Sequence, residues 1–455
     1  MKSPKKERYA VCVIGGGPAG MMAAGRAAEL LAKHPARHSE GSSVVLIEKN
    51  PGLGAKLLIT GGGRCNLTND TPDPRAFLAK LKGKGKFLFS TFSQHAVVDS
   101  LAFFHGRGVP TKVENEGRVF PLSDSARSVY DALVGYMKGS SKGGDVEIAT
   151  DMAATGFHLR DGKIVGLNVA TSRGPATIAA DSYILATGGT SHPETGSTGE
   201  AFEWLRKAGH TIAEPDAALV PIKIAEKWVR ELSGVSHQHA KLTIIEKNGS
   251  SAERRAKSLV GRMVFAHFGV SGPLAINLSK DVRESLQYAE SGGTVELSLD
   301  IMPDFDPAAL DKKIQETFKE NSNKKIKNGL KGLVAPALAP TIIALAKLDP
   351  EKEINVVTRE ERLALARTLK DMRMTQTGFL GKEKAIVASG GVKLEEVDFK
   401  TMRSRIVPNL YLVGDVLDIE RPSGGYSLQI CWSTGWVAGT DAANSNVSSK
   451  REDTR

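Results

Sequence analysis

Six residues near the start of the chain have the types and spacing of a nucleotide-binding turn. Gly15-Gly16-Gly17-Pro18-Ala19-Gly20 matches the pattern G-x-G-x-x-G between an apolar run at 9–14 and a stretch rich in Ala, Met and Leu. In such turns the first Gly permits a tight bend, the second lets backbone approach a pyrophosphate, and the third allows close helix–strand packing. The helix N-terminus adds free N–H groups and a positive dipole end. The pattern predicts phosphate contacts from Gly15, Gly17, Pro18, Ala19 and Gly20.

An acidic residue follows at the end of the next apolar run, residues 44–48. The carboxylate of Glu48 can accept hydrogen bonds from the hydroxyls of an adenosine ribose. It lies 28 residues after Gly20, against about 20 expected. We interpret the polar segment 34–43 as an insertion that accounts for the excess. Glu48 and its neighbour Lys49 are therefore predicted cofactor contacts.

Two later apolar runs also end in glycine. Residues 183–189 read Tyr-Ile-Leu-Ala-Thr-Gly-Gly, and residues 410–415 read Leu-Tyr-Leu-Val-Gly-Asp. Nucleotides bind at the carboxyl ends of the strands of open α/β sheets, so one ligand would meet both ends. This three-part pattern favours FAD over NAD as the cofactor. It predicts further contacts from Ala186, Thr187, Gly188, Gly189, Gly414 and Asp415.

Two other segments could contact a flavin. Three consecutive glycines, Gly61, Gly62 and Gly63, are entropically costly and would let main chain run against the isoalloxazine or pyrophosphate. In the segment that follows, Arg64 could pair with phosphate and Asn66 with the flavin rim, or either could tie down the loop. Cys65 has no cysteine nearby, which argues against a redox role. Gly425 and Tyr426 precede the last helix, whose dipole would stabilise a reduced flavin.

One histidine is a candidate for acid–base catalysis. His267 lies in the stretch Ala266-His-Phe-Gly-Val-Ser-Gly-Pro273, a predicted loop that could close over the open face of the flavin. A structural role for this imidazole stays an alternative. His192 and Arg118 are weaker candidates on the substrate side. The three scattered cysteines make no metal site, and none is predicted.

The predicted helices and strands that position these residues are of two kinds, β-α-β units and antiparallel strands. Buried strands at 9–14 and 44–48 flank a helix at 18–33, which is a β-α-β unit. Residues 145–190 alternate like a small antiparallel sheet. Short strands with Gly and Ser turns then suggest an antiparallel sheet or barrel, followed by amphipathic helices and a return of β-α-β character. The expected later elements are strands at 217–225, 240–246, 258–265 and 294–301, and helices at 307–321, 358–372 and 427–443.

Longer motifs give the chain a family resemblance from residue 9 to about 440. The stretch from Lys56 to Asn69, KLLITGGGRCNLTN, resembles the signature of the BaiN/YhiN-like flavoproteins, some of them of aminoacetone-oxidase type. Gly117-Arg-Val-Phe-Pro121, Gly196-Ser-Thr-Gly199, Ala218-Leu-Val-Pro221 and Gly424-Gly-Tyr-Ser-Leu-Gln429 also match. The resemblance adds Lys56, Thr60 and Gln429 to the predicted FAD contacts. Ala55 and the stretch 420–423 depart from the family pattern, so no substrate is carried over.

The resemblance implies an α/β fold built around a discontinuous, Rossmann-like FAD-binding domain. An antiparallel β-barrel-like domain with a small helical subdomain is inserted into it. The predicted FAD-binding parts are 1–205 and 385–443. The predicted insertion comprises the barrel-like domain 206–302, the helical subdomain 303–373 and a return strand at 374–384, and a disordered tail is expected at 444–455.

Composition and charge limit the classes of partner that the protein could have. The 455 residues carry a net charge of +10, of which +9 lies in residues 1–90, where 15 Lys and Arg face 6 Asp and Glu. That charge suggests phosphate or RNA, but the few aromatic residues, 6%, argue against nucleic acid as a partner. Three cysteines indicate a reducing compartment. No signal segment or membrane span is predicted, so we expect a cytoplasmic protein, with an organelle as the alternative.

These features predict an FAD-dependent oxidoreductase that moves a hydride between flavin and a small organic substrate. NADH, NADPH or O₂ would be the other redox partner, and no second G-x-G-x-x-G unit follows a strand to bind a nicotinamide nucleotide. Two alternatives stay open: a flavin-dependent RNA-modifying or RNA-binding protein, and a flavin-binding protein without turnover. The sequence leaves the substrate and the oligomeric state open.

Overall fold

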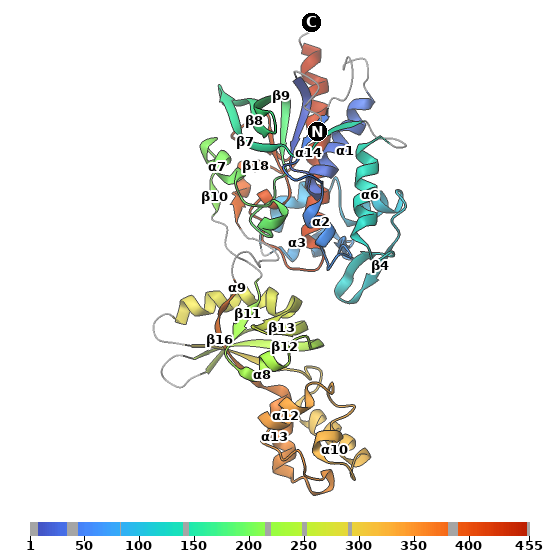
Figure 1. Ribbon diagram of the computed structural model, residues 1–455, viewed down its shortest axis with the longest axis vertical. Helices are drawn as coiled ribbons and strands as arrows, with labels where there is room; N and C mark the ends of the chain where they lie inside the picture. The colour runs from blue at the N-terminus through green and yellow to red at the C-terminus, as the bar shows by residue number, and fades with distance from the viewer. Residues whose placement is uncertain are drawn as a thin grey trace. The chain divides into compact units, whose positions relative to one another are not determined.

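A computed structural model describes residues 8–33, 44–81, 83–139, 145–213, 220–247, 253–289, 294–380 and 390–452 (Figure 1). The chain divides into two compact units, each with its own hydrophobic core. Described residues up to 213 and from 390 onward form the first unit. Residues 220–380 form the second.

The first unit is built on a nine-stranded sheet whose centre is parallel. Its parallel strands lie in the order β20 (Leu410–Leu412), β9 (Gly174–Leu185), β1 (Arg8–Ile14), β2 (Val44–Ile47) and β6 (Val146–Ala149). Nearly all residues of β1 and all of β2 are buried, as expected for strands covered on both faces. The strands predicted at 9–14 and 44–48 are thereby confirmed.

Antiparallel strands join this sheet at two places. β18 (Val397–Asp398) and β19 (Arg403–Ser404) continue it beyond β20. β7 (Ala153–Arg160) and β8 (Lys163–Thr171) form a meander that joins the long strand β9. The antiparallel character predicted for residues 145–190 is confirmed by this meander.

Two helices of the first unit pack unusually closely. α1 (Pro18–Ala32) and α14 (Tyr426–Glu452) run side by side (Figure 1). A Cβ added at Gly435 or Gly439 of α14 would lie 2.5 Å from the carbonyl oxygen of Ala19 or Ala23, respectively. Only glycine lets the two backbones approach this far, so these positions fix the N-terminus of α14 beside the glycine turn.

The last helix is longer than predicted. It continues to Glu452, which corrects both its expected end at 443 and the disordered tail expected from residue 444. Hydrogen bonds explain part of the extension, because Arg403 donates to Ser445 Oγ at 2.6 Å and to Asp441 Oδ2 at 2.6 Å. These bonds tie the helix to β19 just beyond the glycine contacts at 435 and 439.

Short elements surround the sheet of the first unit. A small antiparallel sheet of three strands has the order β3, β5, β4. These short elements are α2 (Ala55–Ile59), β3 (Thr68–Asn69), α3 (Pro74–Ala79), η2 (Gly85–Leu88), α4 (Phe89–Phe92), α5 (Val97–His105), β4 (Thr111–Glu114), η3 (Asn115–Gly117), β5 (Arg118–Pro121), α6 (Ala126–Met137), η4 (Pro193–Thr195), α7 (Ala201–Lys207), β10 (Ile212–Ala213), β17 (Gly391–Val392), η7 (Leu394–Glu396) and η8 (Gly414–Val416).

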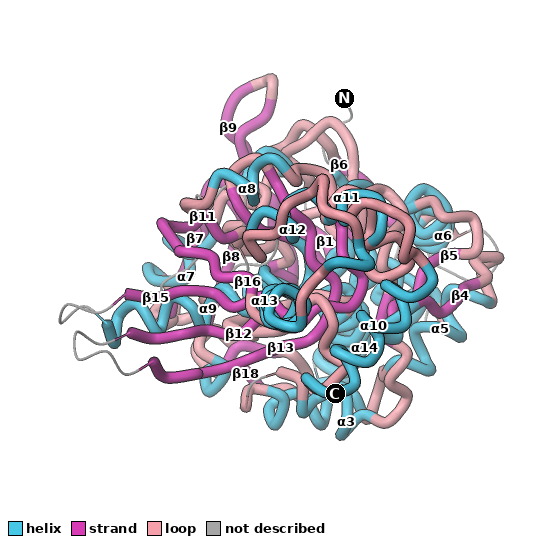
Figure 2. Tube along the Cα trace, turned by 90° about the horizontal axis from the view of Figure 1, so that it is seen from below, coloured by secondary structure: helices cyan, strands magenta, loops and turns pink. Residues whose placement is uncertain are grey.

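The second unit contains a closed barrel with the strand order β11, β14, β13, β12, β15, β16. β12 and β13 are its long strands and pair antiparallel (Figure 2). The helix α9 belongs to the same hydrophobic core through Leu274 and Leu278. The barrel elements are β11 (Ile222–Ile224), α8 (Lys227–Glu231), β12 (Ser236–Lys247), β13 (Glu253–Ala266), β14 (Gly269–Ser271), α9 (Gly272–Ala289), β15 (Thr294–Asp300) and β16 (Met372–Phe379).

A helical part lies between β15 and β16 in the chain. It comprises α10 (Pro307–Glu320), α11 (Ile326–Gly329), α12 (Ala339–Leu345), η5 (Ile354–Val356) and α13 (Arg359–Lys370). Side chains define the starts of the two longer helices: Asp306 caps α10, and Thr358 with Glu361 forms a capping box at α13. The amphipathic helices predicted at 307–321 and 358–372 are confirmed.

The first boundary of the insertion lies later than residue 205. Residues 206–213 belong to the first unit, where β10 pairs antiparallel with β17. This pairing joins the segment before the insertion to the segment after it. Residues 214–219 and 381–389, which include parts of the predicted linking strands, lie outside the described residues.

Candidate cofactor-binding site

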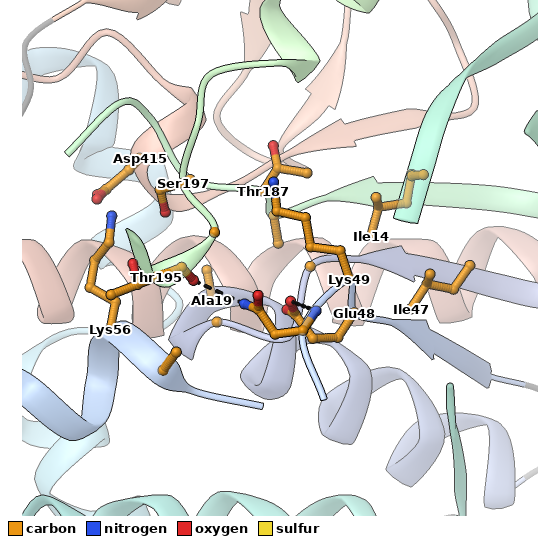
Figure 3. Close-up of a pocket in the computed structure, with 18 of the residues that line it drawn as sticks. Ile14, Ala19, Ile47, Glu48, Lys49, Lys56, Thr187, Thr195, Ser197 and Asp415 are labelled. Carbon is orange, nitrogen blue, oxygen red and sulfur yellow. Dashed lines mark hydrogen bonds between the residues drawn. The ribbon is translucent and has the colours of Figure 1, made fainter. Parts of the chain in front are cut away.

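A cavity of about 820 Å³ opens in the first unit where the parallel strands end. The ends of β1, β2 and β9 and the N-terminus of α1 converge on it, together with the segment after β20 (Figure 3). The predicted contacts found in its wall are Gly15, Gly17, Pro18, Ala19, Glu48, Lys49, Lys56, Ala186, Thr187, Gly188 and Asp415.

A different steric constraint explains why glycine stands at each of the three positions of the nucleotide turn. Gly15 has φ +103°, and an added Cβ would lie 2.6 Å from the carbonyl oxygen of Ala186. A Cβ at Gly20 would lie 2.0 Å from the carbonyl oxygen of Gly15. Gly17 differs, because a Cβ there would meet no other described atom within 4 Å. The backbone at Gly17 therefore faces open space in which a pyrophosphate fits.

The N-terminus of α1 is available to an anion. Gly17 is its N-cap residue, and no side chain of the described residues caps it. Free N–H groups and the helix dipole therefore point toward the cavity. Nearby, the Thr187 hydroxyl is buried with no hydrogen-bond partner among the described residues. An unpaired hydroxyl in the wall is costly unless a ligand pairs with it.

Glu48 is fixed by backbone donors. Its Oε2 accepts from the N–H of Gly16 at 2.8 Å, and its Oε1 accepts from the N–H of Asn50 at 2.8 Å. The side chain is almost fully buried at the edge of the cavity. Each carboxylate oxygen has a second lone pair left, so both can also accept from ribose hydroxyls.

The residues after Glu48 hold a loop against the cavity. Lys49 donates to Glu200 Oε1 at 2.6 Å and to Thr198 Oγ1 at 3.2 Å. Asn50 Nδ2 donates to the carbonyl oxygen of Thr195 at 3.0 Å (Figure 3). The loop therefore forms one wall of the cavity through contacts between segments about 145 residues apart. The Lys49 ammonium group is therefore hydrogen-bonded within the protein.

Charged side chains gather at the other end of the cavity. Lys56 and Asp415 point toward one another in Figure 3, and Lys56 donates to Ser191 Oγ at 3.1 Å. Burial lowers the pKa of Lys56, and the carboxylate of Asp415 opposes that shift. Asp415 is also paired with the buried guanidinium of Arg421. Asp415 thus interacts with both Lys56 and Arg421, and the carboxylate of Glu194 also acts on Lys56.

The segment at the end of β20 comes close to α1. Gly414 has φ +66°, and its N–H donates to Thr434 Oγ1 at 3.1 Å. A Cβ there would lie 3.1 Å from Cβ of Ala19 and 3.4 Å from Sγ of Cys431. Gly414 supports the cavity from behind, whereas Cys431, which the sequence analysis did not include, lines it. Burial raises the pKa of Cys431, so its thiol stays protonated.

The glycine-rich segment after α2 lies outside the cavity wall. Gly61, Gly62 and Gly63 all have positive φ, between +61° and +84°. Thr60 Oγ1 donates to the carbonyl oxygen of Lys56 at 2.8 Å, and the Cys65 N–H donates to the Thr60 carbonyl oxygen at 2.8 Å. These bonds close a tight turn. Glycine is needed here for backbone geometry, whatever ligand the turn meets.

Arg64 and Cys65 are occupied within the protein. Arg64 pairs with Glu114 and, at 2.8 Å, with Asp124, and its guanidinium lies 4.1 Å from the centre of the Phe120 ring. The cation is therefore neutralised by carboxylates. Cys65 is fully buried, and burial raises its pKa to about 12. That environment favours an inert thiol, in line with the sequence argument against a redox role.

Three more predicted contacts meet at the start of α14 instead. The side-chain amide of Asn66 is oriented so that its nitrogen donates to the Thr68 carbonyl oxygen at 3.1 Å and its oxygen accepts from the Gly425 N–H at 3.0 Å. Tyr426 packs on Phe77, with ring centres 4.7 Å apart. These contacts join the predicted signature segment to the N-terminus of α14.

Gln429 and Gly189 are buried and lie outside the cavity wall. Gln429 accepts from Thr68 Oγ1 at 2.8 Å and donates to Ser100 Oγ at 2.9 Å and Ser433 Oγ at 3.0 Å. Its amide is therefore fully used inside the protein, where it connects the signature segment to α5 and α14.

The acid–base candidates lie outside the cavity wall. His267 is exposed at the tight turn between β13 and β14 of the second unit, beside the ring of Phe268. His192 Nδ1 lies 2.9 Å from Glu194 Oε1, and Arg118 donates to the Asn115 carbonyl oxygen at 3.0 Å. Among the described residues, no group of three or more His, Cys, Asp and Glu side chains could hold a metal ion.

Sequence reasoning missed part of the cavity wall. The motif Gly196–Gly199 signalled the loop after η4, but no single residue of it was predicted as a contact. Trp204 and Met152 carry no motif at all, because they reach the cavity through α7 and the segment before β7. The additional lining residues are Ile14, Ile47, Asn50, Gly54, Ala55, Met152, Ala154, Thr195, Gly196, Ser197, Glu200, Trp204, Val413 and Cys431.

The fold and the site define a class of protein. A parallel sheet with a glycine turn, an acidic residue after the second strand and a cavity at the strand ends is the architecture of a dinucleotide-binding flavoprotein. The model of the HI0933-like protein Rossmann domain matches residues 9–441. The chain belongs to this family, and it is an FAD-dependent oxidoreductase.

Curated relatives span almost the whole chain. The chain is 30% identical over 439 residues to 3-dehydro-bile acid Δ(4,6)-reductase of Clostridium scindens, covering 95% of this chain and 98% of that protein. It is 28% identical to the ribosomal RNA dihydrouridine synthase of Escherichia coli, covering 96% and 98% of the two chains. Their similarity includes the insertion as well as the cofactor domain.

Solved structures share the fold at lower identity. The 3-ketosteroid Δ4-(5α)-dehydrogenase of Rhodococcus jostii has a TM-score of 0.52 and 16% identity, covering 97% of this chain and 98% of that one. A flavocytochrome c3 fumarate reductase has a TM-score of 0.51 and 17% identity, covering 97% and 79%. No helix among the described residues is long and apolar enough to cross a membrane.

The residues present fit FAD. The open space at Gly17 and the uncapped N-terminus of α1 suit a diphosphate. The unpaired Thr187 hydroxyl and the carboxylate of Glu48 offer partners for the polar groups of the ligand. These features all belong to the first unit, which therefore contains the cavity by itself.

Proposed function

We propose that this protein reduces a carbon–carbon double bond conjugated with a carbonyl group, using NADH or NADPH as the electron donor. The observation that carries the flavin chemistry of this proposal is the convergence of the glycine turn, Glu48 and the strand ends on one cavity. When bound there, FAD supplies hydride transfer between the two partners. Two electrons and two protons saturate the double bond, and the oxidised nicotinamide nucleotide is the other product.

The names of the relatives support this reaction class. A Δ(4,6)-reductase of a 3-dehydro bile acid acts on double bonds conjugated with a ring carbonyl. A dihydrouridine synthase saturates a uracil double bond that is likewise conjugated with a ring carbonyl. The two substrates differ greatly in size, yet the bond that is reduced is of one kind. We infer that this bond type is shared by the present protein.

The chain's own residues would bind and orient the cofactor. Gly15, Gly17 and the N-terminus of α1 receive the diphosphate, and Glu48 accepts from the ribose. Asp415, held by Arg421, receives the hydroxyls of the ribityl chain. The predicted contacts at 60–66 and 425–429 would act through the turn that they build. A role for His267 in proton transfer stays a prediction, because His267 belongs to the second unit and lies outside the cavity wall.

Anaerobic mixing of the purified holoprotein with NADH or NADPH tests the electron donor. We expect the flavin absorbance near 450 nm to bleach. Adding a 3-oxo-Δ4 steroid, or a single-stranded RNA that contains uridine, should then restore the absorbance and yield the saturated product. Mass spectrometry would show a gain of two hydrogens.

Two results would contradict the proposal. If neither nucleotide bleaches the flavin while an amine or alcohol substrate does, the protein is an oxidase that passes electrons to O₂. If the flavin bleaches but no conjugated acceptor restores its absorbance, the reaction class is wrong. A protein purified without any flavin absorbance would contradict the FAD assignment itself.

A further inference from the structure

A second hollow lies in the helical part of the second unit. This lysine groove, of about 1170 Å³, lies between α11 and the start of α12. Its lining residues are Asn323, Lys324, Lys325, Lys327, Asn328, Leu330, Lys331, Val334, Pro336 and Ala339. None of these belongs to the cofactor cavity, and the groove contains no carboxylate in its wall.

The charges around the groove are only partly balanced. Glu351 pairs with Lys325 at 2.7 Å and with Lys327 at 2.5 Å, and Asp349 and Glu353 also act on Lys325. Lys324 donates to the neutral amide oxygen of Asn321 at 2.7 Å. Neither Lys324 nor Lys331 has a carboxylate within 4 Å in the described part of the chain. These two exposed ammonium groups are available to an anionic ligand.

The backbone holds the lysines in place. The N–H of Ile326 donates to the Lys352 carbonyl oxygen at 2.9 Å, and the N–H of Ile354 donates to the Lys324 carbonyl oxygen at 3.0 Å. Ile326 and Leu338 are fully buried beneath the groove. The lysine-bearing segment is therefore anchored at the start of α11, so binding an anion does not require this part of the segment to fold first.

The chemistry of the lining fits a chain of phosphates better than a single ion. Several ammonium groups and two amides, Asn323 and Asn328, are distributed along the groove, and Val334, Pro336 and Ala339 form an apolar side. Lysines neutralise phosphates without reading sequence, amides hydrogen-bond sugars or bases, and an apolar surface accepts the flat faces of bases.

We propose that the lysine groove binds the phosphate backbone of a single-stranded RNA segment. The proposal rests on the proposed function and names RNA as the class of substrate whose conjugated ring is reduced. The match to the Escherichia coli ribosomal RNA dihydrouridine synthase covers 96% of this chain, and that to the Haemophilus influenzae enzyme of the same name covers 93%. The groove lies outside residues 1–90, where the sequence carries most of its net charge, so it is a separate argument for RNA.

Binding of a fluorescein-labelled, 20-nucleotide single-stranded RNA to the full-length holoprotein tests the groove. We expect the double variant Lys324→Glu/Lys331→Glu to bind at least tenfold more weakly by fluorescence anisotropy. The slope of log K against log salt should fall by about 1.4, because each phosphate contact on a single strand contributes about 0.7. The variant Lys324→Arg/Lys331→Arg should bind like the wild type.

The matched control reverses two charges elsewhere in the same unit. Lys312 and Lys313 are exposed on α10, outside the groove. The variant Lys312→Glu/Lys313→Glu should keep wild-type binding and salt slope. If it loses as much affinity as the groove variant, or if the groove variant loses none, the groove is not the RNA site. Displacement of the RNA by poly-glutamate as readily as by poly-uridine would indicate an acidic protein partner instead.

The two proposals can fail separately. Bleaching of the flavin by NADPH does not involve the groove, so the groove variant should retain it. If the wild type reduces the steroid but binds no RNA, the inference about the groove is wrong and the proposed reaction class stands. If the wild type binds RNA through the groove but reduces no conjugated bond, the reaction class is wrong.

Discussion

Two backbone N–H groups fix the carboxylate of Glu48 at the edge of the cofactor cavity. The charge is therefore oriented by the protein, and its remaining lone pairs face a ligand at no further entropic cost. The same residue also explains why the segment after β2 is well placed, because Asn50 both donates to Glu48 and holds the loop at Thr195.

Replacing Glu48 by Gln should weaken FAD binding by roughly tenfold to a hundredfold, since hydrogen bonds to a charged acceptor contribute about 1.5–3 kcal/mol. The dissociation constant can be measured from the quenching of flavin fluorescence on addition to the apoprotein. Glu203→Gln is the control, because Glu203 is an exposed partner of Arg206 on α7. Equal affinity of the Glu48 variant and the wild type would contradict the assigned role.

His95 is a buried histidine that the cofactor site does not use. Its ring stacks on Trp436 with centres 4.7 Å apart, and its Nε2 has no hydrogen-bond partner among the described residues. Burial lowers its pKa from 6.5 to about 4, Asp99 opposes the shift and Arg26 adds to it. Between these two values the unfolded chain binds a proton that the folded protein excludes.

The free energy of unfolding should therefore fall as the pH is lowered from 6.5 toward 4, by up to about 1.4 kcal/mol per pH unit from this group. Because other groups titrate in the same range, the measurement is the difference between wild type and His95→Phe in urea unfolding at pH 4.5 and 6.5. The variant should lose less stability on acidification. A pH dependence that is the same for both would show that His95 is not the group responsible.

At the scale of elements, the contact between α1 and α14 connects the two ends of the chain to one site. Glycines at 435 and 439 bring α14 against the carbonyl oxygens of the first turns of α1. The N-terminus of α14 then meets the signature segment through Gly425 and Asn66. The helix pair thus determines where the turn at 60–66 lies relative to the nucleotide turn.

The variant Gly439→Ala should lower the thermal unfolding temperature. Alanine favours a helix by about 1 kcal/mol over glycine, but a Cβ placed 2.5 Å from the Ala23 carbonyl oxygen costs about 1–3 kcal/mol in overpacking. The unfavourable effect is the larger one, so we expect a net loss of stability. Gly52→Ala is the control, because a Cβ there meets no other described atom within 4 Å. An unchanged or raised temperature for Gly439→Ala would show that the helices move apart freely.

At the scale of the whole molecule, two separate hydrophobic cores indicate two cooperative units. The cofactor cavity is lined by residues of the first unit alone. Each unit has one proposed phosphate-binding region. The glycine turn lies in the first unit, and the lysine groove lies in the second.

Calorimetry of the apoprotein should accordingly resolve two transitions. FAD at a hundred times its dissociation constant stabilises the unit that binds it by about 2.7 kcal/mol, so only one transition should shift upward. Mass spectrometry after limited proteolysis at the midpoint temperature would identify that unit. A single transition, or an equal shift of both, would indicate that the units unfold together.

Sequence patterns predicted helices and strands well where the local spacing of apolar residues determines which side chains are buried. The apolar runs at 9–14, 44–48 and 183–186 are strands of the parallel sheet, and the helices predicted at 307–321 and 358–372 are α10 and α13. The patterns failed at ends that distant contacts decide, as in α14, which Arg403 helps to hold beyond residue 443.

The sequence by itself determined the cofactor class and the glycine turn, because those depend on residue types at short fixed spacings. Only the tertiary structure decided what the polar side chains touch. Arg64 is captured by Glu114 and Asp124, and Gln429 is used up in a buried network with Ser100 and Thr68. The partners of these side chains lie 50 to 361 residues away in the chain. Local periodicity encodes which face of an element is buried, and it contains no information on which distant groups will meet there.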